Sequence, residues 1–203
     1  MTLRVPKVPL NPRRRDEETI WVDVHERLNK ERYIFLCGLL KNTDVGHING
    51  LLLFLDDDDD EQPILLVINS RGGTLNGALS IYDNMKSVRS DVWTLASGLA
   101  ASAASLILSG GTPKNRLATK HARIMIHQPV IGRLYEPPRM LHAEAGRMYY
   151  SRNKVAEIYS QNTGKPINII QDDMERDRYM SAAEAKDYGI IDHIVEKRKK
   201  ENL

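Results

Sequence analysis

Short runs of consecutive apolar residues alternate along this chain with longer segments in which apolar residues recur at every third or fourth position. Runs rich in leucine and β-branched residues are typical of buried parallel strands. They lie at residues 33–37, 64–69, 92–97, 122–128 and 190–196. The helical spacing occurs at residues 25–30, 44–55, 75–88, 139–163 and 181–190. This alternation favours one α/β domain with a largely parallel sheet and right-handed crossovers.

Polar residues mark where several of these elements begin or end. Ser181 and Glu184 form a capping-box pattern that starts a helix, and Gly189 occupies the position that ends it. Residues 1–19 are rich in proline and charge, which predicts an irregular or mobile segment. The aspartates at 56–60 predict a solvated loop rather than a metal site, because consecutive side chains point in different directions.

Composition and charge exclude several classes of protein. The 203 residues suit a single domain, and 41% hydrophobic with 28% charged residues is typical of a globular chain. A net charge of +2 gives no reason to expect nucleic-acid binding, and the basic clusters at 13–15 and 197–200 are expected to be solvated tails. The single cysteine, Cys37, excludes an internal disulfide and a CxxC metal site. No apolar stretch reaches the roughly 20 residues of a membrane span, and no secretory signal or transit peptide is visible.

Two serines in the small-residue run 98–105 are candidate nucleophiles. The run follows a predicted strand, so Ser102 would open a helix whose N-terminal dipole stabilises nearby negative charge. Ser105 lies one turn further along and is expected to pack in the interior. No Walker P-loop, HExxH or GxSxG motif is present. Tight helix packing also explains a run of small residues, so these positions alone leave both interpretations open.

A serine nucleophile requires a base, and the base requires an acceptor that orients it. His127 ends an apolar strand just before Gln-Pro, which places it at the same edge of the sheet as Ser102. A structural role for His127 is the alternative interpretation. Asp177 is the candidate acid, although its spacing equally allows a helix cap or an ion pair with Arg176 or Arg178.

The sequence SRGG, residues 70–73, is expected to break the strand at 64–69. Glycine lets the backbone turn its N–H groups toward a reacting carbonyl oxygen. A simple turn is the alternative interpretation of the same residues.

Several segments together resemble the ClpP family, the proteolytic subunits of the Clp protease. The matching sequences, in family order from about residue 20 to 196, are ERYIFLCG, LLVINSRGG, SIYDNM, GLAASAASLIL, RIMIHQP, TGKP and DMERDRYMSAAEAKDYGIID. The opening VPKVP further resembles the plastid-encoded form of this family. The resemblance implies an α/β fold of the ClpP/crotonase type, with repeated ββα-type units and a long protruding handle helix.

The resemblance also implies a function and a set of catalytic residues. The chain would be a serine endopeptidase that hydrolyses unfolded proteins to small peptides, with Ser102 as nucleophile and His127 as general base. Asp177 would orient the histidine, and the amides of Gly73 and Ala103 would form the oxyanion hole. No metal or cofactor would be required.

By the same resemblance, residues 1–19 would be an axial-loop segment, 20–196 the peptidase domain, 134–163 its handle helix and 197–203 a basic tail. The expected partners are related ClpP/ClpR-type subunits in a two-ring tetradecamer, a Clp ATPase chaperone and unfolded polypeptides. Neither nucleic acid nor a membrane is expected as a partner. The expected location is the chloroplast stroma.

Three positions depart from the family pattern. Arg71 replaces a proline, and Ala103 and Ala104 replace methionine and glycine. Because backbone groups form an oxyanion hole, we expect an intact triad with altered subsite preference. The region 130–141 also differs from the family and leaves the start of the handle helix undefined. Two alternatives stay open: a structural ring subunit with little activity of its own, and a crotonase-type acyl-CoA enzyme.

Overall fold

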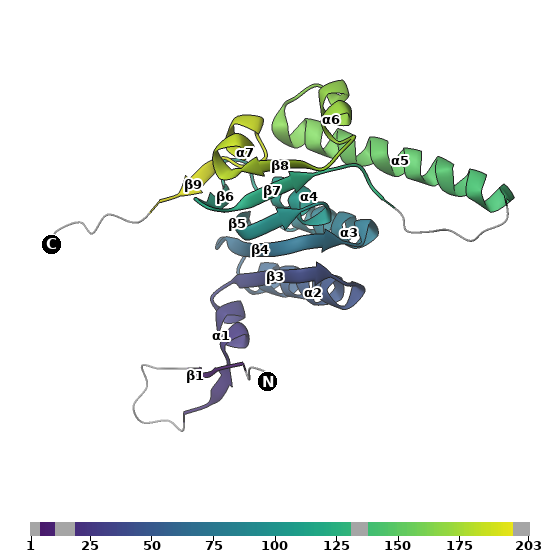
Figure 1. The fold of residues 1–203 in the computed structure, drawn as a ribbon. Coiled ribbons are helices and arrows are strands. Elements are labelled where there is room, and N and C mark those ends of the chain that lie inside the picture. The colour runs from purple at the N-terminus through teal and green to yellow at the C-terminus, as the bar shows by residue number, and fades with distance from the viewer. Residues whose placement is uncertain (1–4, 11–18, 131–137, 197–203) are drawn as a thin grey trace.

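The structure is a computed structural model that describes residues 5–10, 19–130 and 138–196. Seven strands form its central sheet: β3 (Tyr33–Leu40), β4 (Ile64–Gly73), β5 (Val92–Ala101), β6 (Arg116–Thr119), β7 (Arg123–Ile126), β8 (Arg178–Ser181) and β9 (His193–Val195). They pair in the order β3-β4-β5-β6-β9, and β7 pairs with both β5 and β8 (Figure 1). Only the β7–β8 pair of this sheet is antiparallel among the described strands.

Helices cover the sheet and extend from it. They are α1 (Val24–Lys30), α2 (Asn42–Asp58), α3 (Leu75–Ser87), α4 (Ala103–Ser109), α5 (Pro138–Thr163), α6 (Ile167–Asp173) and α7 (Ala182–Tyr188). Strands β3, β4 and β5 are neighbours in chain order, so right-handed crossovers put α2 and α3 on one face, where α4 also packs against β4 and β5 (Figure 1). The predicted α/β class with a mostly parallel sheet is therefore confirmed.

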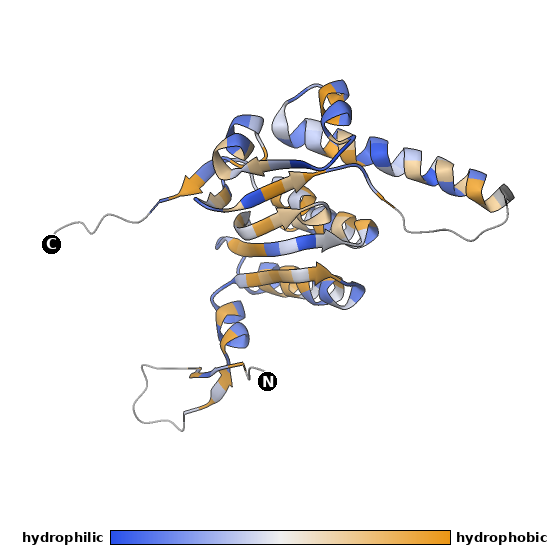
Figure 2. Cartoon of the chain, viewed as in Figure 1, coloured by the Kyte–Doolittle hydropathy of each residue, from blue (hydrophilic) through white to orange (hydrophobic). Residues whose placement is uncertain are grey.

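The hydrophobic core lies between this sheet and these helices. Along β4, Ile64, Leu66 and Ile68 are fully buried and alternate with the half-buried Leu65 and Val67. The alternation arises because successive strand side chains point to opposite faces, and the helices α2 to α4 cover one of them. Figure 2 shows hydrophobic residues concentrated along the strands, whereas α5 carries a mixture of polar and apolar residues.

Strand β5 has two partners on the same side. Its residues Thr94–Ala96 pair with β6, and Leu99–Ala101 pair with β7. The change of partner occurs at Gly98, whose φ of +106° is rarely accessible to other residues. A Cβ at this position would also lie 2.7 Å from Oδ1 of Asn69, which accepts the N–H of Leu99 at 3.1 Å. The split brings the carboxyl ends of β4, β5 and β7 together at one edge of the sheet.

Several predicted boundaries are wrong. Strand β5 continues to Ala101 rather than ending at 97, and β9 begins at His193 rather than at 190. Strand β4 continues through Ser70–Gly73 instead of ending before it, because these residues pair with the end of β3. Helix α2 continues to Asp58, so part of the aspartate run is helical rather than a loop. The carboxylate of Asp56 accepts the backbone N–H groups of Arg89 at 2.9 Å and Ser90 at 2.7 Å, which fixes this end of the helix.

The sequence analysis did not predict several short elements, namely β1 (Lys7–Pro9), β2 (Trp21–Asp23), β6, α6 and β8. Strand β1 pairs with β2, so residues 7–9 are regular rather than irregular as predicted; 1–4 and 11–18 lie outside the described residues. Helix α5 begins at Pro138, and the earlier part of the predicted handle helix, 134–137, lies outside the described residues, as does the basic tail 197–203.

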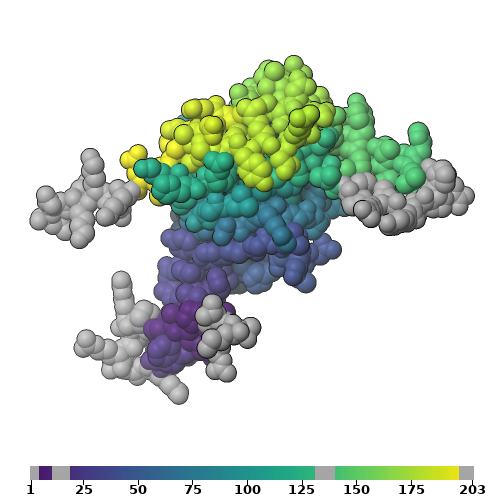
Figure 3. All heavy atoms as spheres, in the orientation of Figure 1, coloured from purple at the N-terminus to yellow at the C-terminus, as the bar shows by residue number. Residues whose placement is uncertain are grey.

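Two parts of the chain project from the body of the molecule (Figure 3). One is the β1–β2 hairpin with α1, next to the edge strand β3. The other is the N-terminal half of α5, which extends beyond the sheet while its C-terminal half packs on α4 and α6. The edge at which β4, β5 and β7 end lies next to α5.

Candidate active site

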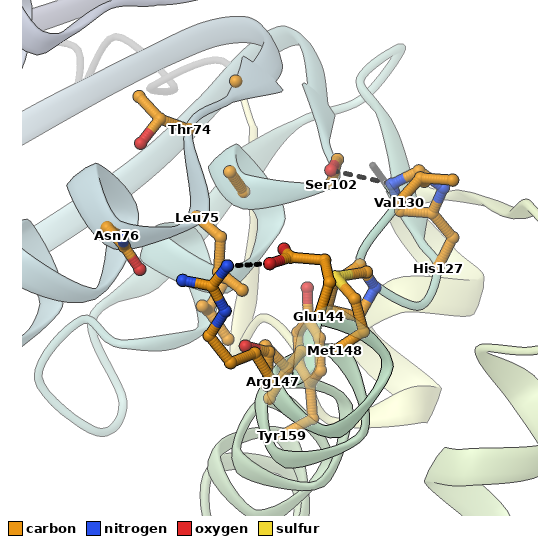
Figure 4. A pocket seen from close by; sticks show the side chains of 16 residues that line it. Thr74, Leu75, Asn76, Ser102, His127, Val130, Glu144, Arg147, Met148 and Tyr159 are labelled. Atoms are coloured by element: carbon orange, nitrogen blue, oxygen red, sulfur yellow. Dashed lines mark hydrogen bonds and ion pairs between the residues drawn. The ribbon is translucent and has the colours of Figure 1, made fainter. Parts of the chain in front are cut away.

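A pocket of about 490 Å³ lies between the carboxyl ends of β4, β5 and β7 and helix α5 (Figure 4). Four of the five residues predicted from the sequence line it: Gly73, Ser102, Ala103 and His127. They reach the pocket from three different strand ends, as expected for a site on a parallel sheet.

Ser102 occupies a sharp turn between β5 and α4. Its backbone has φ 57° and ψ −125°, a conformation that residues with side chains rarely adopt, so the surroundings must hold it. Its N–H donates to the carbonyl oxygen of Met125 at 2.9 Å, and its own carbonyl accepts the N–H groups of Ser105 and Leu106. The first N–H groups of a helix have no intrahelical partner, which leaves the amide of Ala103 available at the pocket.

Gly72 supports this turn from the neighbouring strand. Its φ is +91°, and a Cβ there would lie 2.6 Å from the carbonyl oxygen of Ala101 and 2.9 Å from Cβ of Ser102. At Gly73 a Cβ would lie 2.2 Å from the carbonyl oxygen of Leu40. Both glycines are therefore required by close backbone approach, and the sequence analysis assigned a role only to Gly73.

His127 follows the last residue of β7 and points toward the serine. Its Nε2 lies 2.8 Å from Oγ of Ser102, and its side chain is 19% exposed. The next residue, Gln128, donates its backbone N–H to the carbonyl oxygen of Met174 at 2.7 Å. Pro129 cannot donate to a ladder and ends the strand here, so the imidazole is held at the rim of the sheet.

The pairing of β7 with β8 brings Asp177 to the histidine. Ile126 lies opposite Arg178 in this antiparallel ladder, so the next position of one strand faces the preceding position of the other. Oδ1 of Asp177 lies 2.9 Å from Nδ1 of His127. The alternative ion pair with Arg178 is not formed among the described residues, because Arg178 pairs with Asp173 instead.

These contacts form a chain from Asp177 through His127 to Ser102. When Nδ1–H donates to the carboxylate, Nε2 carries a lone pair that can accept the proton of the serine hydroxyl. Gly73 and Ala103 line the same pocket as the hydroxyl of Ser102. Such an arrangement can perform nucleophilic acyl transfer. The side chain of Asp177 is 57% exposed, so water competes for this carboxylate.

Comparisons with known proteins agree with this geometry. A model of the Clp protease family matches residues 15–198. The chain belongs to the Clp protease family. Its relatives include proteins named ATP-dependent Clp protease proteolytic subunit: one from Triticum aestivum is 42% identical over 196 residues, covering 96% of this chain and 89% of the relative. One from Oltmannsiellopsis viridis is 39% identical over 195 residues, covering 96% and 99%. The prediction of a serine peptidase subunit is thereby confirmed.

The pocket is also lined by residues that the sequence analysis missed. Helix α5 contributes Glu144, Met148, Ser151, Val155 and Tyr159 to the pocket. Their spacing of three or four residues places them on one face of the helix, and this spacing was the signal that could have identified them. Figure 4 shows Glu144 and Met148 facing the space in front of Ser102.

The described part of the chain contains neither a cluster suited to a metal ion nor a membrane-spanning helix. No group of three or more histidine, cysteine, aspartate or glutamate residues there is arranged to hold a metal ion. None of the helices in the same ranges is long and apolar enough to span a membrane.

Proposed function

We propose that Ser102, His127 and Asp177 are the catalytic triad of this Clp protease subunit, with an oxyanion hole formed by the amides of Gly73 and Ala103. The observation that carries this proposal is the continuous hydrogen-bonded chain, 2.9 Å from Asp177 to His127 and 2.8 Å from His127 to Ser102. The strained backbone of Ser102 supports it, because strain of this kind is concentrated at functional sites.

The mechanism is acyl transfer followed by hydrolysis. Oγ of Ser102 attacks the peptide carbonyl while its proton passes to Nε2 of His127, and the carbonyl oxygen becomes an oxyanion at the two amides. Collapse of this intermediate breaks the C–N bond, and His127 returns the proton to the leaving amine. Water then attacks the acyl-enzyme with the same histidine as base. Asp177 holds the required tautomer and stabilises the imidazolium.

The departures from the family pattern are compatible with this mechanism. Ala103 acts through its backbone N–H, which methionine and alanine share. Ala104 lies fully buried inside α4, where alanine is favoured over glycine. Arg71 is exposed and is absent from the described residues that line the pocket, so its charge lies outside the space next to Ser102.

The pocket indicates which substrate side chains it accepts. Leu106, Met148 and Val155 give it an apolar wall, while an ion pair between Glu144 and Arg147 lies on its α5 side (Figure 4). We assign to it an uncharged, apolar side chain next to the scissile bond, because the apolar wall offers a charge no partner and Glu144 and Arg147 already pair with each other.

The proposed partners are related subunits in two stacked rings, a Clp ATPase that delivers unfolded polypeptides, and those polypeptides themselves. The names of the relatives, which include "ATP-dependent" and "subunit", support both kinds of partner. The plant relatives also support a location in the chloroplast stroma.

Covalent labelling tests the proposed function. The assembled native protease is treated with a fluorophosphonate, and the modified residues are mapped by mass spectrometry, with the Ser102→Ala variant as control. The expected result is modification at Ser102 that disappears in the control. If a neighbouring subunit is labelled in the same sample while Ser102 is not, the chain is a structural ring subunit and the proposal fails.

A further inference from the structure

The buried hydroxyl of Ser105 makes contacts that simple packing does not require. Ser105 is fully buried, and its Oγ lies 2.7 Å from the carbonyl oxygen of Ser102 and 2.6 Å from that of Met125. It also lies 2.8 Å from the hydroxyl of Tyr159 on α5. The carbonyl of Met125 also accepts the N–H of Ser102, and the other carbonyl belongs to the strained residue itself.

Counting hydrogens fixes the direction of this network. A carbonyl oxygen can only accept, and Ser105 has one hydroxyl hydrogen, which it donates to one of the two carbonyls at a time. The hydroxyl of Tyr159 therefore donates to Oγ of Ser105. Complete burial raises the pKa of Tyr159 far above its usual value, so this donor keeps its proton at any pH at which the enzyme works.

The carbonyl of Ser102 belongs to the same peptide group as the N–H of Ala103. A hydrogen bond accepted at the carbonyl end of an amide polarises the group and makes its N–H a stronger donor, and hydrogen bonds in a chain reinforce one another. When the hydroxyl of Ser105 donates to the carbonyl of Ser102, the chain from Tyr159 through Ser105 therefore ends on the peptide that supplies one proposed oxyanion donor.

We propose that Ser105, with Tyr159 donating to it, is a positioning residue that holds the turn of Ser102 and strengthens the Ala103 amide as an oxyanion donor. This inference rests on the proposed function, because it assumes that Ser102 is the nucleophile. It links the C-terminal half of α5 to the reacting centre through one hydroxyl pair, 54 residues apart in the chain.

The test measures how fast Ser102 in the assembled protease reacts with a fluorophosphonate. Mass spectrometry of the Ser102 peptide gives the maximal rate, kinact, and the half-saturating concentration, KI, for this chain alone, even when other subunits react. Removing one oxyanion donor lowers the rate by about 10²–10³-fold, and polarisation strengthens a hydrogen bond by roughly 10–30%. If Ser105→Ala removes that fraction of the donor's free energy, kinact should fall roughly 2- to 8-fold. KI should stay unchanged, because the pocket is untouched. The pH at which kinact is half-maximal should also stay unchanged, because the partners of His127 are the same.

Tyr159→Phe provides a second, milder variant. It keeps the ring that lines the pocket and removes only the hydroxyl, so we expect a fall in kinact of about twofold. In the Ser105→Ala background the same change should have no further effect on kinact, because the chain is already broken. Ser105→Thr, which keeps a hydroxyl on Cβ, should restore most of the rate.

Two matched controls lie in the same region. Ser109→Ala removes a buried hydroxyl one turn further along α4, which donates to Leu106 at 2.8 Å and accepts from Asn162 at 3.1 Å. Tyr82→Phe removes a hydroxyl that bonds Asn162 at 3.3 Å. Both should leave kinact unchanged.

The outcomes separate the two proposals. If Ser102 of the unaltered chain does not react, the proposed function fails and this inference fails with it. If Ser102 reacts and Ser105→Ala has the same kinact as Ser109→Ala, only this inference is overturned. If Ser105→Ala does not assemble, the test compares kinact of Tyr159→Phe with kinact of Tyr82→Phe. Equal values overturn the inference, and a twofold lower value for Tyr159→Phe supports it.

Discussion

The two halves of helix α5 are covered in different ways, although they belong to one continuous helix. In the C-terminal half, Val155, Ala156 and Tyr159 are buried against the body of the chain. In the N-terminal half, Tyr149 and Tyr150 are 66% and 68% exposed. The chain itself supplies the partner for one half and leaves apolar surface open on the other.

Polar contacts sharpen the difference between the halves. The carbonyl oxygen of Asn162, near the end of α5, accepts from Nη1 of Arg116 at 2.8 Å, and Arg116 forms an ion pair with Asp192 at 2.6 Å. Among the described residues, the exposed half carries an ion pair between close neighbours on the helix itself, Glu144 with Arg147. The inner half is thus fixed to the body of the chain, whereas the outer half lines the pocket through Glu144 and Met148 and leaves Tyr149 and Tyr150 exposed. We expect these tyrosines to contact another copy or subunit.

The largest expected effect concerns the active site next to α5. Removing the general base with His127→Ala should lower kcat by about 10⁴-fold or more, because the proton of Ser102 then has no acceptor. Peptide hydrolysis gives kcat, and sedimentation should show an unchanged assembly. His121→Ala, which changes an exposed histidine just before β7, is the matched control. A variant retaining a tenth of the activity would contradict the proposed triad.

Asp177→Asn should reduce kcat less strongly. In serine proteases whose triad aspartate is buried, the loss is about 10⁴-fold. Here Asp177 is 57% exposed, and water shares the task of orienting the imidazole, so we expect a loss of about 10²–10³-fold. Steady-state hydrolysis measures the effect, and Asp172→Asn, at an exposed site nearby, should be neutral. Equal rates for the two variants would exclude a role for Asp177 in orienting His127.

A change to the outer half of α5 should weaken assembly and leave the stability of the chain unchanged. Replacing Tyr149 and Tyr150 by glutamine keeps the helix and should weaken assembly by about tenfold for each tyrosine. The unfolding temperature of the isolated chain should not change. As the reciprocal control, Ile158→Val in the inner half should cost about 1 kcal/mol of stability and leave assembly intact. Analytical ultracentrifugation measures assembly, and thermal unfolding measures stability. Unchanged assembly in the tyrosine variant would show that the outer half of α5 does not contact another subunit through these residues.

The smallest expected effect is on the anchor at the inner end of α5. Burial acts to raise the pKa of Asp192, but its hydrogen bonds and ion pair with Arg116 outweigh this and lower the pKa below its usual value. A carboxyl whose pKa is lowered on folding contributes stability above its unfolded pKa of about 3.9, and this contribution disappears as the pH falls through the folded pKa.

Asp192→Asn should therefore lower the free energy of unfolding by about 2 kcal/mol at neutral pH. Below about pH 4, the variant should lose less stability on further acidification than the unaltered chain does. Urea unfolding at several pH values measures both effects. Asp187→Asn, at an exposed position in α7, is the control and should preserve the acid dependence. An unchanged pH profile in Asp192→Asn would show that this ion pair does not stabilise the fold.

Local patterns in the sequence were sufficient for much of the fold. The cap formed by Ser181 and Glu184 is present, with Oγ of Ser181 accepting the N–H of Glu184, and Gly189 has the positive φ of 95° expected at a helix end. A helix follows Ser102, as expected. These features depend on residues a few positions apart, so the sequence contains all the information needed. The catalytic roles of Ser102 and His127 stay predictions, supported by the contacts described above.

The main alternation of strands and helices and the mostly parallel sheet followed from the sequence alone, because hydrophobic periodicity records which residues face the core. The pairing of β7 with β8, which brings Asp177 to His127, did not. Only the tertiary structure decided that β4 runs on to Gly73, that Gly72 must lack a side chain, and that Ser105 bonds Tyr159 rather than merely packing. Each of these depends on the approach of segments that lie far apart in the chain. Periodicity carries no information about such distances, and contacts across the folded chain determine them.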